Sequence, residues 1–195
     1  MNKYLIGLSI GVCLAGAVVI DADKKAEEYK SPVPTAVPTV QIAPTASTTE
    51  KKKAYAAEIP LSPELQVFAR TQAELNDVPY VLVLAVMEQE SRFQIDADGG
   101  DSFGLMQINE VHGARDIIIE PHENIKIGCW LLGYLHREYR DWNKALVAYN
   151  CGESGAYEMY FKHGSISSPY SREVMLRSER FAQLLGEESV LRPRR

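Results

Sequence analysis

The sequence is poor in several residue types whose abundance would define a class of protein. It has only three cysteines and two tryptophans among 195 residues, and its formal net charge is −5. The composition does not indicate collagen, a coiled coil or a polytopic membrane protein. The absence of a basic excess excludes broad nucleic-acid binding, which needs a cationic surface to neutralise phosphates. The four histidines have no metal-ligand spacing, so we expect no metal site.

Long hydrophobic runs are also scarce, and the clearest one lies at the N-terminus. Lys3 precedes Leu5–Ile20, which carries no charge and is shorter than the roughly 20 residues that span a bilayer. Ala15–Ala17 has the small residues that a signal peptidase accepts. We expect residues 1–20 to be a signal peptide or, alternatively, an uncleaved anchor with a membrane tether through residues 5–20. Either form exports the protein, to the periplasm or to the cell wall and extracellular face.

Two further segments have a composition typical of polypeptide that does not fold around a hydrophobic core. Residues 21–58 form a predicted disordered linker, in which Ser31–Thr49 holds four prolines, five threonines and no charge. Spaced prolines favour an extended spacer and leave little apolar surface to bury. Residues 188–195 form a short basic tail. The folded domain is therefore predicted over residues 59–187, a normal size for one core.

This domain has the periodicity of helices. Ser62 and Pro63 form a typical helix start, and the spacing of apolar residues predicts a helix over 63–75. Residues 79–90 are apolar on every face, as in a fully buried helix. Further helices are predicted over residues 121–139, 143–150, 154–161 and 170–185. Because no stretch alternates as a sheet strand does, the predicted fold class is all-α, in a single helical domain.

Glu90 stands at the end of the predicted buried helix, after a run of apolar residues. Desolvation at such a position disfavours the charged form and raises the pKa of a carboxyl group towards neutrality, where it can donate a proton. On this segment alone, a solvent-facing glutamate at a helix terminus fits equally well.

Several short motifs occur in a defined order along the domain. They are Glu90-Ser91, Gly104-Leu105-Met106-Gln107-Ile108, Asn124-Ile125 with Gly128 and Tyr134-Leu135, Ala148-Tyr149-Asn150 with Gly152, and Tyr170. In this order they resemble the lytic transglycosylase (SLT) family of the lysozyme superfamily, over about two-thirds of the chain. The resemblance implies a lysozyme-like fold, no cofactor, and cleavage of the β-1,4 bond between N-acetylmuramic acid and N-acetylglucosamine in peptidoglycan.

The resemblance also implies a role for individual residues. Glu90 is expected to protonate the glycosidic oxygen and then to take the proton of the C6 hydroxyl, which leaves a 1,6-anhydro product. Met106 is expected to pack against the sugar, and Tyr170 to close the pocket. The full set of implied substrate-binding residues is Ser91, Gly104, Leu105, Met106, Gln107, Ile108, Tyr149, Asn150 and Tyr170. Asn124, Ile125 and Gly128 are expected to serve packing of the long helix.

The chain also departs from the family pattern. Its loop with Asp96, Asp98 and Asp101 is acidic, and the segment over residues 100–107 is similar to that of goose-type lysozymes, which hydrolyse the same bond. The three aspartates are either solvated loop residues or include one that holds a water molecule for inverting hydrolysis. A muramidase is therefore an alternative function. A third is a wall-binding or scaffold component of a secretion, conjugation or phage apparatus. Cys151 replaces the usual alanine, and Cys129 and Cys151 either pair or remain two thiols.

Overall fold

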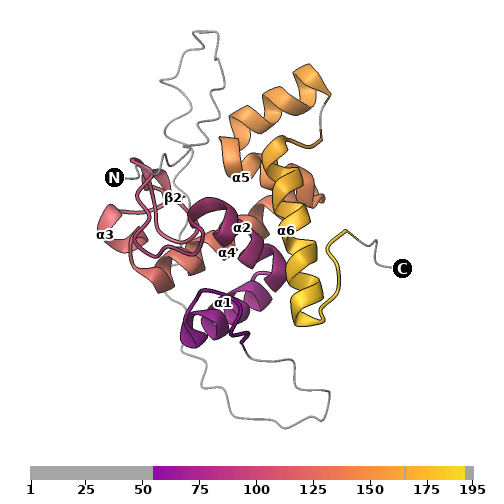
Figure 1. Ribbon diagram of the computed structural model, residues 1–195. Coiled ribbons are helices and arrows are strands. Elements are labelled where there is room, and N and C mark those ends of the chain that lie inside the picture. Colours follow the sequence, from indigo (N-terminus) through magenta and orange to yellow (C-terminus); the bar gives the residue numbers. More distant parts are fainter. Residues whose placement is uncertain (1–54, 165, 192–195) are drawn as a thin grey trace, which may run out of the picture. The chain divides into compact units, whose positions relative to one another are not determined.

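The computed structural model describes residues 55–164 and 166–191. Three predicted parts of the chain lie outside the described residues. They are the signal peptide or anchor at residues 1–20, residues 21–54 of the linker, and the end of the tail at residues 192–195. Within the described range, no helix is both long enough and apolar enough to cross a membrane. Six α-helices dominate this range, and a very short two-stranded sheet accompanies them (Figure 1).

The first two helices form where the sequence predicts them. In α1 (Pro63–Leu75), the Ser62 hydroxyl accepts a hydrogen bond from the Leu65 amide at 3.2 Å, which satisfies one of the unpaired amides of the first turn. In α2 (Tyr80–Ser91), residues 81–87 are at most 1% exposed. The uniform hydrophobicity of α2 therefore reflects a helix that is buried on every face.

The two longest helices confirm the predicted periodicity. α4 (Pro121–Tyr139) packs against α1 and α5, and α6 (Pro169–Leu185) makes its most extensive contact with α2. Figure 1 shows α6 running beside the central α2. α6 begins with a capping box between Ser168 and Ser171 and ends at Gly186, whose φ of 65° favours glycine.

α5 (Trp142–Tyr157) contains a break that the sequence indicates. Gly152 has φ 72° and ψ 167°, which interrupts the helix between the two predicted segments. The second segment continues into a π-helical turn over Glu158–Lys162. The chain direction therefore changes directly after Tyr149 and Asn150, two of the predicted site residues.

A small lobe follows α2 and contains structure that the helical pattern does not predict. β1 (Ser102–Phe103) and β2 (Ile108–Asn109) pair antiparallel, with Ser102 opposite Asn109. A 3-10 turn over Glu110–His112 and α3 (Arg115–Ile118) complete the lobe. The expectation of no sheet is wrong at this point, because strands of two residues are too short to show alternation in a sequence.

One large core surrounds α2, and it determines where the site lies. Buried apolar side chains of α1, α2, α4, α6 and the small lobe form this core, and a smaller apolar cluster joins α4 to α5. The last turn of α2 leaves the core beside the lobe, and Glu90 lies in that turn.

Candidate active site

Glu90 is placed at the boundary between the core and a cleft. The seven residues 81–87 are buried, whereas Glu88, Gln89 and Glu90 are partly exposed. The helix then ends at Arg92, which has a left-handed φ of 53° and donates its amide to the Glu88 carbonyl at 3.1 Å. The carboxyl group of Glu90 thus combines an apolar surrounding with access from one side.

This surrounding changes the protonation of Glu90. Burial raises the pKa of its carboxyl group from the ordinary 4.5 to about 7, and a hydrogen bond donated by the Tyr170 hydroxyl to Oε1 opposes the rise. Burial together with the Glu90 charge holds the pKa of Tyr149 and of Tyr170 well above the ordinary value for tyrosine. Glu90 is consequently a carboxylic acid that changes charge near neutral pH beside two neutral hydroxyls.

Residues 104–108 form one wall of the site beside Glu90, and a buried side-chain amide of α4 holds this wall in place. Asn124 Oδ1 accepts the Met106 amide at 2.8 Å, and its Nδ2 donates to the carbonyls of Phe103 and Ile118, both at 2.7 Å. Gly104 has φ 74°, and a Cβ atom there would lie 2.6 Å from Asn124 Nδ2. The glycine therefore permits both the turn and the close approach of the asparagine.

The same wall is bound by two more helices. The Ser91 hydroxyl at the end of α2 donates to the Leu105 carbonyl at 2.8 Å, and the Tyr149 hydroxyl of α5 donates to the Met106 carbonyl at 2.8 Å. Gln107 turns its backbone at φ 47°, and its side-chain amide donates to the Gly104 carbonyl at 3.1 Å. Three helices thus fix a wall whose own strands are only two residues long.

The wall, α2, α4 and α5 enclose a cleft of about 510 Å³. Its lining is largely polar, and Glu90 is the only carboxylate among the described residues that form it. The lining residues are Glu90, Gly99, Ser102, Gln107, Ile108, Asn109, Val111, His112, Leu131, Tyr149, Asn150, Cys151 and Gly152. A carboxylic acid whose pKa lies near neutral pH can protonate a leaving group that is bound in such a cleft.

The structure separates the predicted site residues into two groups. Glu90, Gln107, Ile108, Tyr149 and Asn150 line the cleft. The other predicted residues, which are not among the lining residues, are Ser91, Gly104, Leu105, Met106 and Tyr170.

Met106 differs most from its expected role. Its side chain and that of Leu105 have no exposed surface, and the Met106 sulfur packs on α4 at Gly128, where a Cβ atom would lie 2.3 Å from it. In this structure Met106 therefore supports the wall, and the expected contact with a sugar is not available to it. Tyr170 acts on Glu90 by its hydrogen bond.

Sequence reasoning did not identify several residues of the cleft. Asn109, His112 and Leu131 line it, and burial lowers the pKa of His112. The first two follow the Gln107-Ile108 motif closely, but the turn that brings them to the cleft has no sequence signature. Asn124 was expected to pack, whereas its amide is the main polar support of the wall.

The structure also shows the surroundings of the loop aspartates and of the two cysteines, whose roles the sequence left open. Asp96, Asp98 and Asp101 are exposed and outside the cleft lining, and Asp98 pairs with Arg115 at 3.1 Å. Cys129 is buried and is not bonded to Cys151, whose thiol donates to the Val147 carbonyl at 3.0 Å. Within the described ranges, no three His, Cys, Asp or Glu side chains gather closely enough to hold a metal ion.

The fold and the site together define a helical, lysozyme-like domain with a single acid in its cleft. Residues 68–162 match the family described as "Transglycosylase SLT domain". This match covers just under half of the chain and includes the ordered motifs from Glu90 to Gly152. No curated protein matches the chain.

Solved structures with the same fold come from much longer proteins. An inactive glutamate-to-glutamine mutant of lytic transglycosylase Slt from Pseudomonas aeruginosa is 19% identical, with a TM-score of 0.57, over 65% of this chain and 25% of its own. The 70-kDa soluble lytic transglycosylase Slt70 from Escherichia coli is 17% identical at the same TM-score and coverage. A complex of the 70-kDa soluble lytic transglycosylase with bulgecin A is 18% identical. The chain spans about a quarter of the length of these proteins.

Proposed function

We propose that this protein is a peptidoglycan lytic transglycosylase and that Glu90 is its catalytic acid and base. The observation that carries the proposal is the Glu90 carboxyl group, which has a pKa of about 7 and is the only carboxylate among the described cleft-lining residues. The match of residues 68–162 to the SLT family supports it. The similar Pseudomonas aeruginosa protein is described as inactive when one glutamate becomes glutamine, which supports a role for a glutamate here as well.

The proposed reaction needs no second carboxylate. Protonated Glu90 gives its proton to the glycosidic oxygen while the bond from that oxygen to C1 of the N-acetylmuramic acid breaks, through an oxocarbenium-like transition state. The C6 hydroxyl oxygen of the same sugar then attacks C1, and its proton passes to the Glu90 carboxylate. The nucleophile is part of the substrate and so has a high effective concentration. The product carries a 1,6-anhydro end, and no water is consumed.

The wall of the cleft supports a role in orientation. Gln107 and Asn150 line the cleft and carry side-chain amides, which can bind the N-acetyl and hydroxyl groups of a glycan. Tyr149 binds the Met106 carbonyl with its hydroxyl, so its ring is fixed at the edge of the cleft beside Asn150. These residues would hold the sugar against Glu90 without taking part in proton transfer.

The substrate of such an enzyme lies outside the cytoplasmic membrane. We therefore propose that the protein is exported through residues 1–20 to the periplasm or to the cell wall. A further proposal is that it opens the wall for a secretion, conjugation or phage apparatus. Cell fractionation of the full-length protein tests the export, which is contradicted if the protein remains in the cytoplasm.

A product analysis tests the enzymatic proposal. Full-length protein and its Glu90→Gln variant are incubated with purified bacterial sacculi, and the released muropeptides are identified by mass spectrometry. We expect the wild type to release 1,6-anhydro-muropeptides, each lighter by one water than the hydrolytic product, and the variant to release none. Circular dichroism of the variant controls for folding.

Two other outcomes would contradict the proposal. Products with reducing ends would identify a muramidase, and the water would then have to be activated by a group other than the exposed loop aspartates. No release by the folded wild type, combined with binding to sacculi, would identify a wall-binding component.

A further inference from the structure

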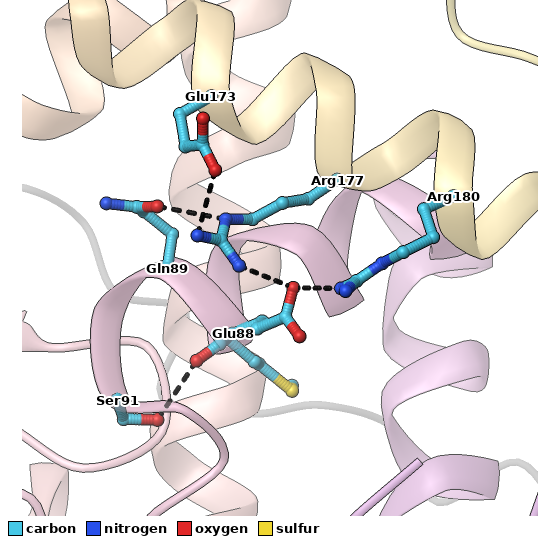
Figure 2. Close-up of polar contacts among 7 residues, drawn as sticks. Glu88, Gln89, Ser91, Glu173, Arg177 and Arg180 are labelled. Carbon is cyan, nitrogen blue, oxygen red and sulfur yellow. Dashed lines mark hydrogen bonds and ion pairs between the residues drawn. The ribbon is translucent and has the colours of Figure 1, made fainter. Parts of the chain in front are cut away.

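A polar network joins the last turn of α2 to the middle of α6. Figure 2 shows the Arg177 guanidinium between two residues of α2, Glu88 and Gln89, and one residue of its own helix, Glu173. Arg177 donates from Nη1 to Glu88 Oε2 at 2.7 Å and from Nε to Gln89 Oε1 at 3.1 Å. Its Nη2 pairs with Glu173 Oε1 at 2.9 Å. Arg180 binds the same oxygen of Glu88.

The central pair of this network, Glu88 and Arg177, is less exposed than its outer members Arg180 and Glu173. The Glu88 side chain is 19% exposed and that of Arg177 is 29% exposed. Burial by itself would raise the pKa of Glu88, but the hydrogen bonds from Arg180 and Arg177 outweigh it and lower the pKa. Glu88 is thus a charged acceptor, and a planar guanidinium that binds three partners at once has little freedom to shift.

The network and the site connect the same two stretches of helix. Glu88 and Gln89 are the residues just before Glu90, in the same turn of α2. On α6, Tyr170 lies seven residues before Arg177, which is close to two helical turns along the helix. The bond from Tyr170 to Glu90 and the bonds from Arg177 to Glu88 and Gln89 therefore both depend on the position of α6 against the end of α2.

We propose that Arg177 is a positioning residue for Glu90. By binding Glu88, Gln89 and Glu173 together, it fixes α6 against the last turn of α2 and keeps the Tyr170 hydroxyl on the Glu90 carboxyl group. The inference rests on the proposed function in taking Glu90 as the catalytic acid. Its test measures the protonation of Glu90 itself and needs no turnover.

The other groups around Glu90 do not obscure that measurement. Tyr170 of α6 and Tyr149 of α5 have pKa values well above 10, and Cys129 of α4, which faces Tyr149, has a raised pKa as well. His112 shares the cleft, and its pKa is lowered. Burial and the Tyr170 hydroxyl are the causes of the Glu90 shift. Arg177 is thus expected to act on Glu90 mainly through Tyr170.

The experiment is a titration of full-length protein labelled with 13C at the glutamate carboxyl groups. The Glu90 resonance is assigned as the one missing from Glu90→Gln. We expect Tyr170→Phe to raise the Glu90 pKa by about one pH unit, because a hydrogen bond to the charged form is lost. Arg177→Met should raise it by a similar amount, and the double variant by no more than Tyr170→Phe alone.

Two matched variants separate position from charge. Arg177→Lys keeps the positive charge but cannot bind three partners. It should therefore show most of the rise in the Glu90 pKa that is expected for Arg177→Met. Arg180→Met removes a positive charge from the same Glu88 oxygen but leaves Arg177 in place, so the Glu90 pKa should not change. Where Arg177→Met does not fold, the comparison of Arg177→Lys with Tyr170→Phe takes its place.

Several results would overturn the inference. These are an unchanged Glu90 pKa in Arg177→Met, additive shifts in the double variant, or an equal shift in Arg180→Met, which would indicate charge alone. The product analysis on sacculi is read separately: a wild type without anhydro products would refute the proposed function and leave the titration intact. An active wild type with an unchanged pKa in Arg177→Met would refute only the role of Arg177.

Discussion

Glu90 lies at the edge of the core in the last turn of α2, three residues after Met87, where the run with almost no exposed surface ends. That position supplies the desolvation, and Tyr170 supplies the one hydrogen bond that limits it. A pKa of about 7 follows from these two opposing effects. The chemistry thus depends on where a buried helix ends, as much as on the identity of the residue.

Asn124 shows how one buried side chain can determine the shape of the cleft. Asn124→Ala leaves the Met106 amide and the carbonyls of Phe103 and Ile118 buried without their partner. Because an unsatisfied buried group costs about 1–3 kcal/mol, we expect the free energy of unfolding to fall by roughly 3 kcal/mol. Urea denaturation measures the loss.

The exposed Asn150 provides the control for this prediction. Asn150→Ala makes the same chemical change in the cleft lining, and its free energy of unfolding should stay within about 0.5 kcal/mol of the wild type. Equal losses in the two variants would contradict the role of Asn124 as the polar support of the wall.

At the scale of elements, the helices were predictable because their signals are local. The capped start at Ser62, the apolar run of α2 and the break at Gly152 are each contained in a few consecutive residues. The small lobe was not predictable, because its strands are too short for a pattern. Its form depends on hydrogen bonds from Ser91 and Asn124, which lie in other elements.

The candidate site divides in the same way. Glu90, Tyr149 and Asn150 could be predicted from the ordered motifs, whereas the segment of Glu90 alone left its environment open, and all three line the cleft. The burial of Met106 and the cleft position of His112 could not, because each depends on how the lobe folds back on α4 and α5. Local sequence therefore predicted the acid better than it predicted the wall around it.

Helix α4 approaches the end of α1 at Gly133. A Cβ atom at this glycine would lie 2.5 Å from the backbone oxygen of Asn76, the C-cap of α1. Alanine normally stabilises a helix by about 1 kcal/mol relative to glycine. Here the collision with backbone decides the sign, and we expect Gly133→Ala to lower the free energy of unfolding by about 1–3 kcal/mol.

Thermal and urea unfolding of Gly133→Ala measure this effect. Glu138→Ala, at an exposed position of the same helix, is the control, with a change within about 0.5 kcal/mol. A Gly133→Ala variant more stable than the wild type would mean that the contact between α1 and α4 is looser than the structure has it.

At the scale of the whole molecule, the same carboxyl group links stability to pH. Burial raises the Glu90 pKa from 4.5 to about 7, so the folded protein holds a proton that the unfolded chain has lost. The contribution of Glu90 to stability is complete below pH 4.5 and is lost as the pH rises through 7. Glu90→Gln removes this loss, so it should be more stable than the wild type at pH 8, by roughly 2 kcal/mol after allowance for partial exposure.

Glu88, two residues earlier in the same turn, provides a control of opposite sign. Arg180 and Arg177 lower its pKa against the effect of burial, so its contribution is present at neutral pH and is lost as the pH falls through its lowered pKa. We expect Glu88→Gln to be less stable than the wild type at pH 8, with a difference that shrinks in acid. Glu90→Gln should be more stable than the wild type at pH 8, and this difference of opposite sign should also shrink in acid. Urea denaturation at pH 4, 6 and 8 measures both differences, and two variants that shift in the same direction would contradict the assigned environments of the two glutamates.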